Sequence, residues 1–293
     1  MNDAALAAAP VPPSLARRII AFPLTLLILG FVGVAAVGVA VARSWDLLEF
    51  ESNTPQKMLG AVLMAAAVIL AYKAFKRWVE RAPDTEFAAN GALPELAAGI
   101  AFGTLLFTVM TGIVALLGGF EVLGVRGAGQ IWTMLAIAIV SGTIEETLFR
   151  GIVLRHLEQL IGTWGALAFT SALFGLLHIV NPDATWWSSL AIALEAGILL
   201  GAAYLLTRRL WLAIGIHAAW NFTQGWVFSV PVSGGDAPLG LLITRRVGPD
   251  WLTGGDFGLE ASVVAMVIAT SAGVLLLVMA ARRGQIVRPM WRR

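Results

Sequence analysis

Three pairs of residues with a spacing of four, and one further carboxylate, stand out in an otherwise apolar sequence. The pairs are Glu146 with Arg150, Phe174 with His178, and His217 with Asn221, and the added carboxylate is Glu145. All lie in segments apolar enough to be membrane spans, where an ionisable side chain costs about 2.5–3.5 kcal/mol at mid-bilayer on insertion scales. Charged residues retained at such a cost are candidates for proton transfer, ion passage or catalysis.

Helix geometry divides the two adjacent carboxylates between different environments. Side chains at i and i+4 share a helix face, so Glu146 can pair directly with Arg150. Glu145 is rotated about 100° away by the 3.6-residue period. We therefore expect one neutralised and one free carboxylate, and each histidine can face the cavity that holds Glu145.

Composition identifies a membrane protein. Hydrophobic residues make up 58% of the 293 residues and charged residues 13%, and the mean hydropathy is +0.82, whereas soluble domains carry roughly 25% charged residues. There is no cysteine, which excludes disulfides, thiolate metal sites and a cysteine nucleophile. The net charge of +2 does not suggest a nucleic-acid partner.

Stretches of about 20 apolar residues predict an all-α, polytopic helical bundle with about eight transmembrane helices. The expected spans are roughly 19–42, 57–75, 93–118, 129–150, 163–181, 186–207, 210–230 and 258–281. The expected domains are a flexible tail at 1–16, an N-terminal unit of three spans at 17–128, a core at 129–281 and a basic tail at 282–293.

The distribution of basic residues predicts the orientation, because cytoplasmic loops of membrane proteins are enriched in Lys and Arg. With a cytoplasmic N-terminus, fifteen of the 20 Lys and Arg residues fall on the cytoplasmic side. The other five are Arg43, Lys57, Arg126, Arg245 and Arg246. We therefore expect both termini in the cytoplasm.

The depth of the polar residues can also be compared. Glu145 lies 17 residues before Gly162 and His178 lies 16 residues after it, so a turn at Gly162 would bring them level. This requires the fourth helix to continue through 151–160, where Arg155, His156 and Glu158 suit a solvated cytosolic extension. The sequence then predicts a site that opens towards the cytoplasm.

The three motifs together resemble a known family. Glu145-Glu146-Thr-Leu-Phe-Arg150, Phe174-Gly-Leu-Leu-His178 and His217-Ala-Ala-Trp-Asn221 are similar to the EExxxR, FxxxH and HxxxN/B motifs of the CPBP family of CAAX proteases and bacteriocin-processing enzymes. The resemblance covers about 129–281, including a Gly-rich stretch that runs from Gly254 to Glu260. The first 128 residues carry no motif.

The resemblance implies an intramembrane endopeptidase and a role for each motif residue. Glu145 would activate water as general base, with His178 holding or polarising that water, and the oxyanion would be stabilised by His217 and Asn221. Glu146 and Arg150 would be a structural pair, and Phe174 would serve mainly in packing. The resemblance favours no required cofactor, although zinc held by Glu145, His178 and His217 stays open.

Other interpretations also remain open. A transporter or a non-enzymatic bacteriocin-immunity protein could use the same buried charges. Glu195, in the sixth span, is either a structural partner or an active-site group. The expected partners are a membrane-anchored peptide or protein substrate and the lipid bilayer, with the plasma membrane of a bacterium as the expected location; the sequence carries no signal of oligomeric state.

Overall fold

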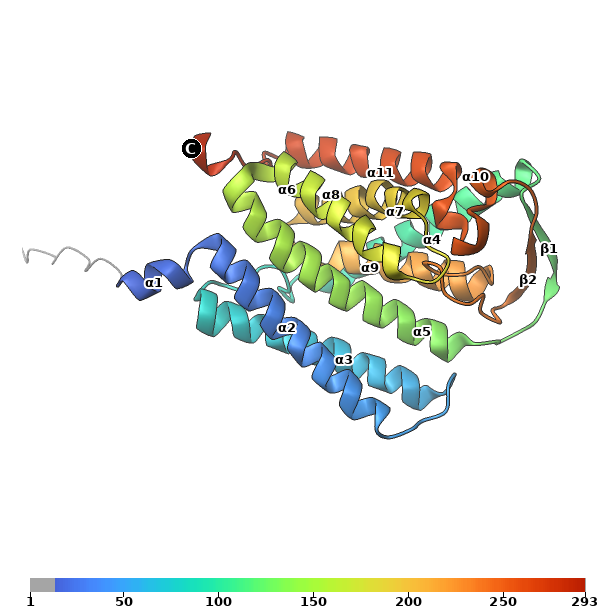
Figure 1. The fold of residues 1–293 in the computed structure, drawn as a ribbon, viewed down its shortest axis with the longest axis horizontal. Helices are drawn as coiled ribbons and strands as arrows, with labels where there is room; N and C mark the ends of the chain where they lie inside the picture. The colour runs from blue at the N-terminus through green and yellow to red at the C-terminus, as the bar shows by residue number, and fades with distance from the viewer. Residues whose placement is uncertain (1–13, 293) are drawn as a thin grey trace, which may run out of the picture.

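Apolar helices long enough to cross a membrane make up most of the described chain. The computed structural model describes residues 14–292 (Figure 1). Six helical runs within them have the length and hydropathy of a membrane span: Pro23–Asp46, Pro55–Glu80, Ala92–Leu116, Ile131–Val180, Trp186–Thr207 and Val263–Arg282. Their outward faces expose apolar side chains such as Leu70, Leu105 and Leu275, which lipid tails solvate as water cannot. The chain is an integral membrane protein with an all-α bundle, as the sequence predicts.

The elements follow one another in chain order, with η marking π-helical or 3-10 segments. They are α1 (Leu15–Ile20), α2 (Pro23–Asp46), α3 (Pro55–Ala74), η1 (Phe75–Glu80), α4 (Ala92–Leu116), β1 (Phe120–Val125), α5 (Ile131–Val140), η2 (Ser141–Glu145), η3 (Thr147–Leu154), α6 (Arg155–Leu177), η4 (His178–Val180), α7 (Trp186–Ile192), η5 (Ala193–Gly197), α8 (Ile198–Thr207), α9 (Trp211–Phe222), η6 (Thr223–Val227), β2 (Leu242–Arg246), α10 (Asp250–Thr253), η7 (Gly255–Phe257), η8 (Leu259–Ala261), α11 (Val263–Arg282) and η9 (Met290–Arg292). Most of the predicted tail, 1–16, lies outside the described residues, and α1 begins at Leu15.

The chain reverses direction at Gly162, as the depth comparison predicts. Gly162 has φ 76° and ψ 169° inside the helical run Ile131–Val180, a left-handed φ that glycine adopts without steric cost. The predicted spans 129–150 and 163–181 are thus two arms of one helical hairpin. The predicted count of eight is not confirmed, because the six membrane-length runs combine these arms and do not include the shorter helix formed by α9 and η6.

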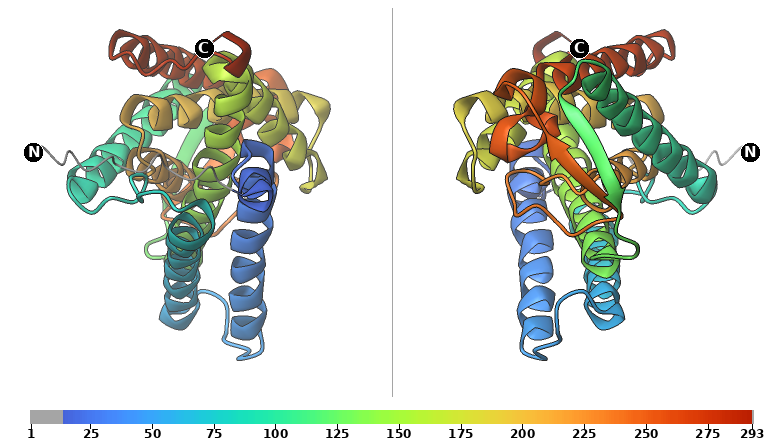
Figure 2. Two further views of the ribbon diagram at one scale, coloured as in Figure 1. Left: turned by 90° about the vertical axis from the view of Figure 1, so that its left-hand side faces the viewer. Right: turned by 90° about the vertical axis from the view of Figure 1, so that its right-hand side faces the viewer.

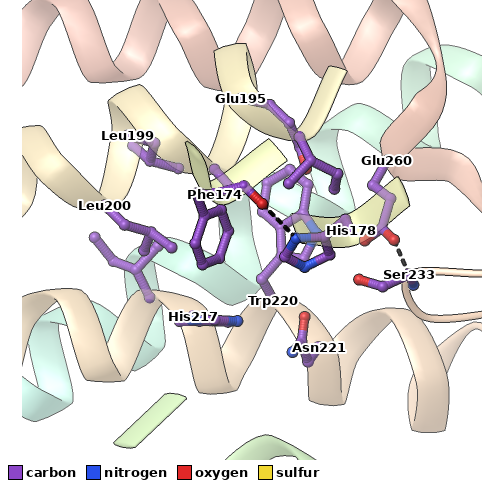
Figure 3. Close-up of a pocket in the computed structure, with 13 residues that line it drawn as sticks. Phe174, His178, Glu195, Leu199, Leu200, His217, Trp220, Asn221, Ser233 and Glu260 are labelled. Atoms are coloured by element: carbon purple, nitrogen blue, oxygen red, sulfur yellow. Dashed lines mark hydrogen bonds between the residues drawn. The ribbon is translucent and has the colours of Figure 1, made fainter. Parts of the chain in front are cut away.

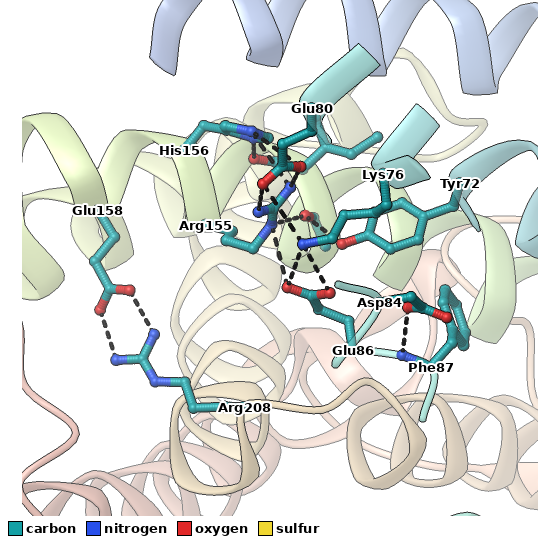
Figure 4. A network of polar contacts seen from close by, with 12 residues as sticks. Tyr72, Lys76, Glu80, Asp84, Glu86, Phe87, Arg155, His156, Glu158 and Arg208 are labelled. Carbon is teal, nitrogen blue, oxygen red and sulfur yellow. Dashed lines mark hydrogen bonds and ion pairs between the residues drawn. The ribbon is translucent and has the colours of Figure 1, made fainter. Parts of the chain in front are cut away.

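The extension beyond Arg150 is helical but not solvated, so one prediction was wrong. His156 has an exposed fraction of 0%, and Arg155 and Glu158 are also buried. Partners from distant segments compensate these polar groups (Figure 4): both terminal nitrogens of Arg155 donate to Glu80 at 2.6 Å. Lys76 joins the same network through Glu80 at 3.5 Å and through Glu86. Buried charges are tolerated when they are paired and hydrogen-bonded in this way.

The N-terminal hairpin, defined here as α2, α3 and η1, holds the helix that carries Glu145 at both ends. Asn53, in the loop before α3, accepts hydrogen bonds from the backbone N–H groups of Trp132 and Thr133 and donates to the carbonyl of Gly129. It therefore satisfies two of the free donors at the start of α5. At the far end of this helix, η1 holds Arg155 through Glu80.

Close backbone packing fixes the helix that carries His217. A Cβ atom on Gly103 of α4 would lie 2.5 Å from the carbonyl oxygen of Ile216, and one on Gly99 would lie 2.5 Å from that of Leu212. Small residues spaced by four allow two helix backbones to approach closely in membranes. The side chain after Ile216, which is His217, is therefore placed by α4 as well as by its own helix.

A two-stranded antiparallel sheet, which the sequence did not predict, closes one end of the bundle. β1 pairs with β2 from Phe120 opposite Arg246 to Val125 opposite Leu242. Figure 2 shows the two strands side by side across that end. The helices α1 and η9 lie at the opposite end (Figure 1).

Candidate active site

The Glu145-Glu146 pair lies where the helix after α5 widens into the π-helical segments η2 and η3. Such segments are rare and occur frequently at functional sites. Glu146 is fully buried, and its Oε1 accepts a hydrogen bond from Nη1 of Arg150 at 2.8 Å. Glu145 keeps 34% of its side chain exposed. The predicted division into one neutralised and one free carboxylate is confirmed.

Arg150 and Phe174 form the wall behind this pair. The second terminal nitrogen of Arg150 donates to the carbonyl oxygens of Ala196 at 3.1 Å and Gly197 at 3.4 Å. The guanidinium carbon lies 4.6 Å from the centre of the Phe174 ring, and the edge of that ring also packs against Phe149. Phe174 is buried among these groups, and its packing role stays a prediction.

His217 connects the two carboxylates. Its Nδ1 lies 2.8 Å from Oε1 of Glu146, and its Nε2 lies 4.0 Å from Oε2 of Glu145. An ionised carboxylate only accepts hydrogen bonds, so Nδ1 carries the proton that it donates to Glu146. The Nε2 atom therefore faces Glu145, and Glu146 supports both Arg150 and His217.

His178 and Asn221 are each oriented by one further hydrogen bond. Nδ1 of His178 lies 2.7 Å from the carbonyl oxygen of Phe174, and because a carbonyl can only accept, this nitrogen is the protonated one. The amide nitrogen of Asn221 donates to Oγ of Ser141 at 2.9 Å. The second amide hydrogen of Asn221 and Nε2 of His178 remain for other partners.

The four predicted catalytic side chains meet around one cavity of about 480 Å³. Glu145 lies on its wall together with His178, His217 and Asn221. The remainder comes from α5 and the residues next to it, from the residue after η4 and from the loop that follows η6: Gln130, Thr133, Met134, Ile137, Ser141, Asn181, Val232, Ser233, Gly235, Asp236, Ala237, Pro238 and Leu239.

The cavity lies towards the end of the bundle opposite α1 and η9 (Figure 1). The position of the cavity affects two predictions: the side of the membrane on which the termini lie and the side to which the site opens. If both termini are cytoplasmic, the loop residues 232–239 face the other side of the membrane, and so does this end of the cavity. Cytoplasmic termini and a site open to the cytoplasm, both expected from the sequence, are therefore incompatible in this fold.

The zinc site that the resemblance left open stays a prediction. Among residues 14–292, no group of three or more His, Asp or Glu side chains is arranged to hold a metal ion. The proposed set would need Glu145, His178 and His217 to converge at zinc–ligand distances of about 2.0–2.2 Å. Nδ1 of His217 is bonded to Glu146, and its Nε2 lies 4.0 Å from Oε2 of Glu145.

Sequence reasoning missed several polar residues around the site. Ser141 lies four residues before Glu145, so the spacing used for the other pairs could have identified it. Ser233 and Glu260 follow no such spacing. They reach the site because the loop after η6 folds over it and η8 packs against α7 and α11, and Glu260 joins Glu195 in a second, smaller cavity.

Comparison with known proteins agrees with the motifs. A family model described as Type II CAAX prenyl endopeptidase Rce1-like matches residues 127–223, which include all three motifs. The match ends before the Gly-rich stretch at Gly254 that was included in the resemblance. Neither the search of curated proteins nor the search of solved structures found a match. Over residues 127–223 the chain is therefore similar to Rce1-like endopeptidases, in agreement with the CPBP family that its motifs resemble.

Proposed function

We propose that this protein is an intramembrane endopeptidase that hydrolyses a peptide bond of a membrane-associated peptide or protein. The Rce1-like match and the membrane-length helices support a membrane-embedded protease. The observation that carries the proposal is the unequal environment of the two carboxylates. Glu146 is bonded to both Arg150 and His217. Glu145 is accessible in a cavity that His178, His217 and the amide of Asn221 also line.

In the proposed reaction, Glu145 accepts a proton from a water molecule in the cavity. Its exposed fraction admits that water, and its separation from Arg150 leaves the carboxylate able to act as a base. His178, which lines the same cavity, helps to hold this water. The hydroxide attacks the peptide carbonyl, and the proton on Glu145 then passes to the leaving amine.

The negative charge of the tetrahedral intermediate needs donors on the other side of the carbonyl. Glu146 beside Nδ1 favours the imidazolium form of His217, as a carboxylate does beside a catalytic histidine in other hydrolases. Nε2–H of this imidazolium and the second amide hydrogen of Asn221 are the proposed oxyanion donors. Such a donor is typically worth about 2.7–4 kcal/mol in the transition state.

The proposed location is the plasma membrane of a bacterial cell, with both termini cytoplasmic. In this orientation the cavity faces the non-cytoplasmic half of the bilayer. The proposed substrate is a peptide, a bacteriocin precursor or a membrane protein whose cleavage site can reach that depth.

The test is cleavage of a membrane-anchored peptide by the purified protein in lipid nanodiscs. The wild type should cleave it and Glu145→Gln should not. Asn221→Ala should lower kcat more than it raises KM, because an oxyanion donor acts mainly on the transition state. Proteomes of cells that carry the wild type or Glu145→Gln would then identify the natural substrate by the fragment missing from the variant. Equal cleavage by wild type and Glu145→Gln would refute the proposal.

A further inference from the structure

A second cavity adjoins the active site and holds two carboxyl groups that the proposed reaction does not use. It has a volume of about 30 Å³, enough for roughly one water molecule. Glu195 from η5 and Glu260 from η8 line it together with His178 and His217 (Figure 3). His178 and His217 therefore line both the catalytic cavity and this smaller cavity.

Glu195 lacks the partners that an ionised carboxylate needs at this depth. It lies near the middle of the run Trp186–Thr207, and 2% of it is exposed. Its Oε2 is buried and has no hydrogen-bond partner among the described residues. Arg150 donates to the backbone carbonyl of Ala196, the residue after Glu195, but its charge is paired with Glu146. A buried charge without such compensation is strongly unfavourable, and the neutral acid is the stable form.

Glu260 is the member of the pair that is equipped to carry the negative charge. The backbone N–H of Ser233 donates to its Oε1. Hydrogen bonds from backbone N–H groups favour the ionised form of a carboxylate. Two carboxyl groups that share one buried site cannot both ionise without a large penalty, and one of them keeps a proton. The contacts assign that proton to Glu195.

His178 provides the acceptor for this proton's hydrogen bond. Its Nδ1–H is committed to the carbonyl of Phe174, so its Nε2 has a free lone pair. A buried water needs two to four polar partners, and a water in the small cavity could accept from the Glu195 hydroxyl and donate to Nε2 of His178.

We propose that Glu195 is a positioning residue, held as the neutral acid, whose Oε2–H orients His178 through one buried water, while Glu260 remains ionised. The ionisable groups that face Glu195 across this cavity are Glu260 of η8, His178 of η4 and His217 of α9. The effect on His178 rests on the proposed function. The protonation of Glu195 does not depend on the proposed function, and it can be measured without an activity assay.

Infrared spectroscopy of the full-length protein in nanodiscs tests the protonation directly. The wild type should show the carbonyl stretch of a buried carboxylic acid at neutral pH. Glu195→Gln should remove this band and Glu260→Gln should retain it. A band removed only by Glu260→Gln, or no such band in the folded wild type, would overturn the assignment.

Kinetics of two size-matched variants test the positioning role. Glu195→Gln keeps a neutral donor and should keep kcat, whereas Glu195→Leu loses the donor and should lower kcat about two- to tenfold at unchanged KM, the usual net effect of one hydrogen bond. Equal losses in both variants would refute the donor role. An inactive wild type that still shows the band would count against the proposed function and not against the protonation of Glu195.

Discussion

Amide replacement of the two adjacent carboxylates should separate catalysis from stability. Glu145→Gln preserves volume and removes the proton acceptor. The nearest ionisable partner of Glu145 is His217 at 4.0 Å, and a third of the side chain is exposed, so the loss of folding free energy should stay below about 1 kcal/mol. Loss of a general base typically lowers the rate by about 10²–10⁴-fold, and that is the expected decrease in kcat.

Glu146→Gln should also lower the folding stability, because it removes the charge that stabilises the buried side chains of Arg150 and His217. Arg150 and His217 would then face a neutral amide in place of the carboxylate oxygen that accepts from both, and the other acceptors of Arg150 are only the carbonyl oxygens of Ala196 and Gly197. Removing one partner of a buried ion pair costs about 3–5 kcal/mol. At about 1.4 kcal/mol per factor of ten, the folding equilibrium should fall by about two to four orders of magnitude.

Unfolding by denaturant in nanodiscs and cleavage of a membrane-anchored peptide should be measured on the same preparations. The double variant Glu146→Gln with Arg150→Gln is the matched control, because it removes both charges and should regain part of the stability lost in Glu146→Gln. If Glu146→Gln is as stable as Glu145→Gln, the buried pair does not support the fold. If Glu145→Gln retains full activity, Glu145 is not the base.

Three further predictions concern packing, metal and orientation. Gly103→Ala should destabilise the protein and lower its activity, because the added Cβ would meet the backbone of α9. The control Gly112→Ala, whose Cβ would have nothing within 4 Å, should be neutral or slightly stabilising. Equal unfolding midpoints of the two variants would contradict this packing. The purified protein should contain well under one equivalent of zinc and keep its activity after exhaustive chelation. If activity is lost on chelation and restored by adding zinc, a metal-dependent mechanism replaces the proposed one. Topology reporters at Gly162 and after Arg293 should read cytoplasmic and one at Gly235 non-cytoplasmic; because Gly235 lines the catalytic cavity, a cytoplasmic reading there would reverse both the membrane orientation and the side that the cavity faces.

Local spacing predicted the parts of the site that lie on single helices. The pairing of Glu146 with Arg150 and the different environment of Glu145 depend only on helical geometry, which the sequence encodes residue by residue. The turn at Gly162 was also readable, because it lies midway between two polar residues that had to be level. These features required no knowledge of how the helices pack.

Features that depend on distant contacts could not be predicted in this way. His156 looks solvated from its polar neighbours, yet it is fully buried beside Glu80 of η1. The lining of the cavity by residues 232–239 and the meeting of Glu195 with Glu260 arise from a loop whose course no periodicity specifies. The number of spans also depends on where helices bend or shorten, which hydropathy alone does not resolve.

The N-terminal hairpin sets a limit on what can be separated from this protein. It carries no motif and lies outside residues 127–223, yet Asn53 caps the start of the helix that carries Glu145 and Glu80 holds its far end. A fragment cut at the border of the matched region would keep every motif residue and lose both supports. The region shared with the family and the region needed to hold the carboxylates in place are therefore different lengths of chain, and only the longer one is an architectural unit.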